Sequence, residues 1–95
     1  MNQADREILR RVVLNFLAIR NVAAFSAEQI SNRINAERQM DRPVSAEEVT
    51  SAADLLVEAG MVRSLPDGIG VIDYYKATAA GVLDSEKWRF GRGMA

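Results

Sequence analysis

The sequence contains no cysteine and no histidine among its 95 residues. Without cysteine the chain has no disulfides, no thiolate zinc site and no cysteine nucleophile. Without histidine it also lacks the commonest general base and the commonest metal ligand. Lysine and arginine together number 12, against 13 aspartates and glutamates, so the formal net charge is −1. This near-neutral balance argues against a protein that coats nucleic acid by bulk attraction.

Long apolar runs and linker-like segments are also missing. The most apolar stretch, Val12–Ile19, contains Asn15 and is followed by Arg20. It is shorter than the roughly 20 residues that span a bilayer and makes a poor signal peptide. We therefore expect a cytoplasmic protein with no membrane partner. The length favours one domain over residues 1–95, with a loose tail at 88–95.

Residues 3–20 have the apolar periodicity of an amphipathic helix. One face would carry Ile8, Val12, Phe16 and Ile19. Leu14 and Leu17 lie off that face, so the helix is apolar around much of its circumference. Such a helix is sandwiched either within its own domain or against a second copy. From the second alternative we expect a homodimer with Leu14, Leu17 and Trp88 as contacts.

Two serines carry complete signals for the start of a helix. Ser26 is followed three residues later by Gln29, and Ser45 by Glu48. In each pair the hydroxyl can cap a backbone N–H while the longer side chain reaches back. The predicted helices run over Ala27–Glu37 and Ala46–Ala59. Their expected core residues are Ile30, Ile34, Val49, Ala52, Ala53 and Leu56.

Beyond Gly60, which is placed to end the preceding helix, the pattern changes to short β-prone runs. Met61–Leu65 and Val71–Tyr75 flank the turn sequence Pro-Asp-Gly-Ile-Gly, which predicts a hairpin. Thr78 then caps a last helix, expected over Ala79–Lys87 with Val82 and Leu83 turned inward.

Two segments resemble the winged-helix branch of the helix-turn-helix proteins. Ser45–Val62 is similar to the family's third helix and its exit into the wing: a capping serine, then leucine, two variable residues, a small residue, glycine and two apolar residues. Tyr75–Gly81 is similar to the Tyr-x-x-Thr-x-x-Gly that closes the wing. The resemblance covers roughly residues 5–86. It implies a mainly α fold with a small β-hairpin wing, in the order α-α-(short β)-α-β-β-α.

The resemblance also implies DNA binding and transcription regulation, with the third helix in the major groove. The solvent-facing positions carried over from the family are Glu47, Glu48, Thr50, Ser51, Asp54 and Leu55. Thr50 and Ser51 suit base edges and phosphates, but the carboxylates have the wrong sign. Residues 46–75 hold one basic and six acidic residues, whereas each flanking segment has two more basic than acidic residues. The acidic segment thus falls where the family places its DNA-facing surface.

Two functions remain open. In the first, the chain is a protein–protein interaction module in a nucleic-acid-associated assembly. It would use the six positions above together with the wing, with Val57 as further apolar contact. Glu58 would join the other carboxylates of the helix in selecting a basic partner. In the second, it is a dimeric DNA-binding regulator that contacts phosphates through arginines around the third helix. Those candidates are Arg33, Arg38, Arg42 and Arg63, with Lys87, Arg89 and Arg92 in the tail.

No motif for catalysis, cofactor binding or metal binding is present. The two lysines and the serines form no nucleophile motif, and the glycines form no phosphate-binding loop. We therefore expect a non-enzymatic protein without a cofactor or a small-molecule substrate. Its size would suit a phage or bacterial accessory protein.

Overall fold

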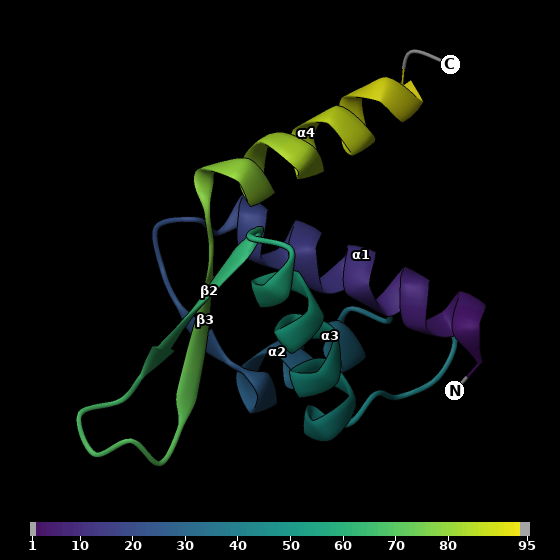
Figure 1. The fold of residues 1–95 in the computed structure, drawn as a ribbon. Coiled ribbons are helices and arrows are strands. Elements are labelled where there is room, and N and C mark those ends of the chain that lie inside the picture. The colour runs from purple at the N-terminus through teal and green to yellow at the C-terminus, as the bar shows by residue number, and fades with distance from the viewer. Residues whose placement is uncertain (1, 94–95) are drawn as a thin grey trace.

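The computed structural model describes residues 2–93, with side chains to residue 91. In these residues four helices pack together with one small antiparallel sheet, which lies at one side of the molecule and has the strand order β1-β3-β2 (Figure 1). The elements in chain order are α1 (Gln3–Ile19), β1 (Phe25–Ser26), α2 (Ala27–Ala36), α3 (Ala46–Glu58), β2 (Val62–Pro66), β3 (Asp73–Ala77) and α4 (Ala79–Gly93). Among the described residues, no helix has the length and apolarity that a membrane span requires.

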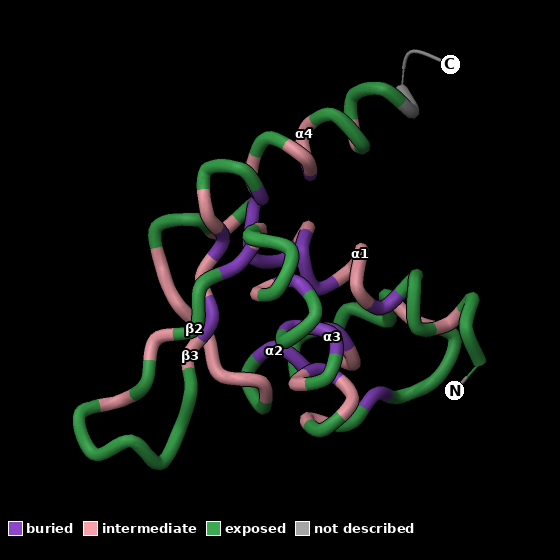
Figure 2. Tube along the Cα trace, in the orientation of Figure 1, coloured by how far each residue is buried: buried purple, intermediate pink, exposed green. Residues whose placement is uncertain are grey.

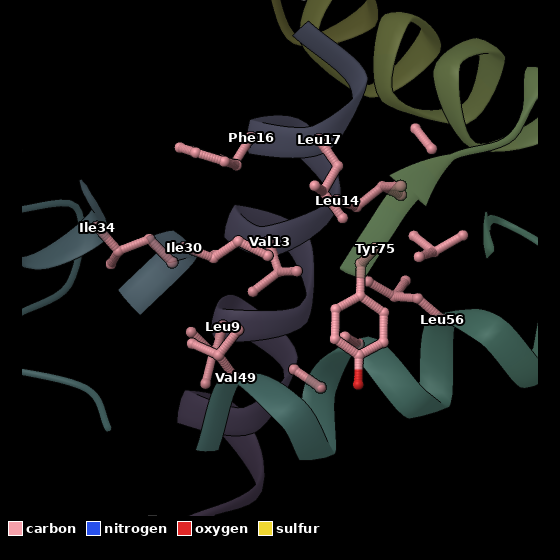
Figure 3. Packing of buried hydrophobic residues seen from close by; sticks show 14 of the residues in the cluster. Leu9, Val13, Leu14, Phe16, Leu17, Ile30, Ile34, Val49, Leu56 and Tyr75 are labelled. Atoms are coloured by element: carbon pink, nitrogen blue, oxygen red, sulfur yellow. The ribbon is translucent and has the colours of Figure 1, made fainter. Parts of the chain in front are cut away.

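Helix α1 forms the centre of the core. Its buried residues are Leu9, Val13, Leu14, Phe16, Leu17 and Ala18. Figure 3 shows Val13 beside Ile30 of α2, and Leu9 beside Val49 of α3. Because α2 and α3 pack on one side of α1 and β3 and α4 on another, the buried face is wide. The prediction that Ile8 and Ile19 point inward is wrong: they are 51% and 57% exposed.

Helices α2 and α3 begin at the predicted capping boxes. The Ser26 hydroxyl accepts from the Gln29 N–H at 3.2 Å, and the Ser45 hydroxyl from the Glu48 N–H at 3.1 Å. Both reciprocal side-chain bonds are also formed. Gly60 ends α3 with a φ of 79°, in the left-handed region that glycine favours. The expected core residues of both helices are buried: Ile30, Ile34, Val49, Ala52, Ala53 and Leu56.

The wing hairpin forms one to two residues later in the chain than predicted. The short third strand, β1, precedes α2, whereas we expected a short strand between α2 and α3. Phe25 is the register partner of Tyr75 on β3. The α2–α3 loop is instead fixed by Asn35, whose side-chain amide donates to the Val44 carbonyl at 3.0 Å and accepts from the Val44 N–H at 2.8 Å. The Asn35 side chain thus binds both backbone groups of Val44, where we expected strand hydrogen bonds.

Helix α4 continues to Gly93, so residues 88–93 are helical and the expected loose tail is wrong over this range; residues 94–95 lie outside the described residues. Contacts with α1 hold the helix in place. The fully buried Ser85 donates to Oδ1 of Asn15 at 2.7 Å, and Arg11 pairs with Asp84 at 2.8 Å. Val82 packs against the core as predicted, but Leu83 is 53% exposed. Figure 2 shows the far end of α4 and the wing tip as largely exposed.

Candidate functional site

The solvent-facing side of α3 carries a row of carboxylates. Glu47, Asp54 and Glu58 are separated by seven and four residues, so they lie on one stripe of the helix, opposite its buried residues. All three are exposed. The ion pairs found among the described residues involve none of them. We call these three residues the acidic ridge.

Glu48 differs from the acidic ridge because its carboxylate already has partners. One oxygen accepts from the Ser45 N–H at 3.0 Å, and the other from Nη2 of Arg42 at 2.9 Å. The Ser45 N–H and then Arg42 hold the pKa of Glu48 below its ordinary value. The predicted contact of Glu48 with a partner stays a prediction; in the structure its carboxylate caps α3 and binds Arg42 of the preceding loop.

The side of α3 that faces the wing is joined to β3 through a buried tyrosine. Tyr75 is 2% exposed, and its hydroxyl donates to Oδ1 of Asp54 at 3.2 Å. Burial, followed by the negative charge of Asp54, raises the pKa of Tyr75 to about 12. Figure 3 shows the Tyr75 ring extending from β3 toward α3. Tyr75 therefore ties β3, at the base of the wing, to α3. Thr50 lies on this side of α3, half-buried, as does Val57, which packs against the core.

The opposite side of α3 faces α1 across a groove of about 500 Å³. Ser51 and Leu55 line it from α3, and Arg6 and Arg10 line it from α1. Leu55 is 46% exposed. Leu55 thus offers apolar surface outside the core, and its contact with a partner stays a prediction.

The wing tip is apolar and well organised. Ile69, Val71 and Ile72 are 82%, 75% and 45% exposed. The Asp67 carboxylate accepts from the backbone N–H groups of all three, at 3.2, 3.0 and 3.3 Å respectively. Residues 64–75 include neither lysine nor arginine. These apolar tip residues were not among the predicted site residues, although their position beside two turn glycines was a visible signal.

Two of the four candidate phosphate-binding arginines are paired with carboxylates. Arg33 lies 3.4 Å from Glu37, and Arg42 lies 2.9 Å from Glu48. Arg38 is exposed in the loop after α2 and belongs to no ion pair among the described residues.

The fourth candidate, Arg63, lies on β2 with Lys76 as its register partner on β3. Successive side chains alternate between sheet faces, so Arg63 and Lys76 lie on the face opposite Tyr75. Because Tyr75 is directed toward α3, Arg63 is on the far side of the wing from the acidic ridge. The structure therefore does not bring the four arginines together on one surface.

The predicted dimer contacts have different environments. Leu14 and Leu17 are 1% and 0% exposed in the chain's own core, so their prediction as contacts with a second copy is wrong. Trp88 is 36% exposed on α4, and the Arg11 guanidinium lies 5.2 Å from its ring centroid.

The three basic residues near the C-terminus also differ from one another. Lys87 is exposed on α4, whereas Arg89 donates to the Ser85 hydroxyl at 3.2 Å. The Arg92 side chain lies outside the described part. Within that part, no cluster of three carboxylates is arranged to hold a metal ion.

No protein-family model matches the sequence, and no curated protein matches it. Solved structures similar to this chain include the transcriptional regulator Cth-833 from Clostridium thermocellum, with a TM-score of 0.72, 18% identity and coverage of 99% of this chain and 92% of that one. A PadR-like transcriptional regulator from Bacillus cereus is similar with a TM-score of 0.71 and 16% identity, and the match covers 98% of this chain and 88% of that one. PadR from Bacillus subtilis, in complex with operator DNA, is similar with a TM-score of 0.66 and 17% identity, and the match covers 85% of this chain and 47% of that one. Together with the element order and the β2–β3 wing, these likenesses identify the fold as a winged helix.

Proposed function

We propose that the chain is a non-enzymatic winged-helix module that binds a basic protein partner in a nucleic-acid-associated assembly. Its contact surface consists of the acidic ridge, Leu55 and the wing tip. The observation that supports this most strongly is the acidic ridge itself, because its three exposed carboxylates belong to no ion pair among the described residues. Unneutralised charges of one sign favour a partner of the opposite sign and set its orientation.

The same charges oppose the usual role of a third helix in DNA binding. Affinity for duplex DNA depends largely on neutralising phosphates with lysine and arginine. The outward stripe of α3 presents Glu47, Asp54 and Glu58 instead, and the nearby Arg42 is already paired with Glu48. A phosphate backbone facing this stripe would meet like charge, whereas a basic protein surface would meet opposite charge.

The wing tip, which projects beyond the helices, offers the partner further apolar area (Figure 1). Ile69 and Val71 are largely exposed, and their backbone N–H groups donate to the Asp67 carboxylate, which favours this conformation of the tip. A preorganised loop loses little conformational entropy when it binds. Exposed apolar side chains on such a loop favour a protein pocket over a sugar-phosphate backbone.

The test compares affinity capture by the wild type with capture by Glu47→Lys/Glu58→Lys. Asp54 is left unchanged because it accepts from Tyr75. The matched control is Glu28→Lys/Asp41→Lys, which makes the same charge change at two exposed positions outside α3. We expect a protein that copurifies with the wild type and the control to be lost from the ridge variant. Equal recovery with all three proteins would contradict the proposal.

A DNA-binding regulator is the second candidate, and one comparison favours it: the B. subtilis PadR structure contains operator DNA. Arg38 and Arg42, both in the loop before α3, would then supply phosphate contacts. Duplex binding at 50 mM salt should weaken steeply as salt rises, and Arg38→Ala/Arg42→Ala should reduce that slope. Duplex binding whose salt slope the substitutions leave unchanged would argue against these contacts.

We further propose a homodimer that forms through α4. Leu83 and Phe90 are seven residues apart on the outward stripe of α4, and they are 53% and 62% exposed. In this dimer Leu83 and Phe90 take the contact role first predicted for Leu14 and Leu17, which are buried in the core. Sedimentation should show a dimer that Leu83→Glu/Phe90→Glu converts to a monomer. A wild-type monomer at high concentration would exclude this arrangement.

A further inference from the structure

The groove between α1 and α3 has unpaired positive charge on one wall. Arg6 and Arg10 line it from α1, and neither belongs to an ion pair among the described residues. The groove continues toward α4 as a second hollow of about 410 Å³, because Arg10 and Leu55 line both parts. In this second part Glu7 adds a carboxylate and Arg11 is neutralised by Asp84. The free positive charge is therefore concentrated at Arg6 and Arg10.

The floor and the other wall have a different character. The exposed apolar lining consists of Leu55, which belongs to both parts, and of Ala59 and the half-buried Met61 in the second part. The other apolar lining residues are buried beneath them, and Ser51 and the Arg42-paired Glu48 complete the α3 wall of the first part. Beyond the α3 wall lies the acidic ridge. The groove thus has exposed apolar side chains, chiefly Leu55, between arginines along one border and carboxylates along the other.

We infer that this α1–α3 groove binds an amphipathic α-helix of a partner protein, and that the helix carries acidic residues on one flank of its apolar stripe and basic residues on the other. The acidic flank would face Arg6 and Arg10, and the basic flank would face the acidic ridge. This inference rests on the proposed function, because it specifies the kind of partner that α3 receives.

Size and charge both support a helix as the occupant. The α3 residues that line the groove extend from Glu48 to Ala59, which at about 1.5 Å per residue corresponds to roughly 17 Å, or three helical turns. Amphipathic helices bind such grooves through apolar side chains spaced along one stripe. A helix with both flanks basic would be repelled by Arg6 and Arg10, and one with both flanks acidic would be repelled by the ridge. Only mixed flanks match both borders.

The experiment uses three synthetic helical peptides of about 15 residues with the same leucine stripe. One has an acidic and a basic flank, one has two basic flanks and one has two acidic flanks. Fluorescence anisotropy with the full chain should show that the mixed peptide binds about tenfold more tightly than either of the others. Arg6→Glu/Arg10→Glu should make the doubly basic peptide the tightest, because both borders of the groove are then acidic.

Two single variants test the position of the site. Leu55→Asp should weaken all three peptides by about tenfold or more, since it places a charge in the apolar floor. Ile19→Asp is the matched control, because Ile19 is a similarly exposed apolar residue that does not line the groove. Equal binding of the three peptides, preference of the wild type for the doubly acidic one, or a ranking that the arginine reversal leaves unchanged would overturn the inference.

These outcomes are distinct from a failure of the proposed function. The capture experiment changes Glu47 and Glu58 and leaves Arg6, Arg10 and Leu55 intact. A partner lost with the ridge variant, combined with equal binding of the three peptides, would retain the protein-binding function and reject a helix in this groove.

Discussion

Gly81 occupies a position where α4 passes very close to the backbone that leads into the wing. A Cβ added at Gly81 would lie 2.0 Å from the Met61 carbonyl oxygen and 3.2 Å from Cδ1 of Leu14. The Met61 carbonyl cannot turn away freely, because it accepts from the Thr78 N–H at 3.0 Å. Thr78 in turn caps α4 through its bond from the Gly81 N–H at 3.1 Å. The substitution Gly81→Ala therefore strains the junction between α3, the wing and α4.

The expected magnitude combines two opposing effects. Replacing a helical glycine with alanine stabilises a helix by about 1 kcal/mol. Overpacking against a fixed backbone atom costs about 1–3 kcal/mol and occasionally more, and the 2.0 Å contact places Gly81 at the upper end of that range. Loss of the bond between Thr78 and Met61 adds about 1 kcal/mol. We expect Gly81→Ala to lower the free energy of unfolding by about 2–3 kcal/mol.

Gly91 offers a matched control in the same helix, since a Cβ there meets nothing within 4 Å. Gly91→Ala should leave stability unchanged or raise it by up to about 1 kcal/mol. For a domain of this size the Gly81→Ala change corresponds to a fall of roughly 10–20 °C in Tm, measured by thermal unfolding with circular dichroism. A Tm for Gly81→Ala equal to that of Gly91→Ala would refute the close approach of α4 to Met61.

Two further predictions concern the end of α2 and the tyrosine beneath α3. Arg38 has a φ of 52° at the C-terminal end of α2, a conformation that costs a non-glycine residue about 1 kcal/mol. Arg38→Gly should therefore raise the free energy of unfolding by about 0.5–1 kcal/mol, which urea denaturation would show as a higher midpoint concentration. A lower midpoint would contradict this prediction. The pKa of Tyr75 is raised from 10.0 to about 12 in the folded protein. The stability that this shift gives the folded state is therefore complete below pH 10 and is lost as pH rises from about 10 to 12. Urea unfolding at a series of pH values should show that Tyr75→Phe loses less stability than the wild type between about pH 10 and 12. Parallel plots of stability against pH for the two proteins would contradict the raised pKa of Tyr75.

Local chemistry made the helix starts and ends predictable. Ser26 and Ser45 each form the capping box that the spacing of Gln29 and Glu48 implied. Gly60 has the left-handed φ that ends α3. These signals depend on residues within four positions of one another, so no tertiary information is needed to interpret them. The order of three helices, hairpin and helix followed from the same local signals.

Features that depend on packing were not predictable in the same way. The buried side of α1 is determined by α2, α3, β3 and α4 together, so Leu14 and Leu17 lie inside while Ile8 lies outside. The attachment of α4 to α1 uses the bond between Ser85 and Asn15, residues that are 70 positions apart. Neither arrangement follows from periodicity alone.

The candidate site was partly predictable for the same reason. The excess of carboxylates on α3 is evident from spacing, but the pairing of Arg42 with Glu48 and the position of Arg63 behind the wing require the tertiary structure. The α1–α3 groove likewise arises only when Arg6 and Arg10 lie beside Leu55.

The central claim is that the outward face of α3 repels phosphate and is therefore available for protein. The most direct measurement is anisotropy of a labelled 30-base-pair duplex at 50 mM salt, titrated with the wild type and with Glu47→Lys/Glu58→Lys. We predict no saturable binding by the wild type at concentrations where the variant, with its ridge reversed, binds the duplex in the micromolar range typical of non-specific contacts, about 1–100 μM. Tight wild-type binding that falls steeply with salt, and that the reversal weakens or leaves unchanged, would contradict the claim.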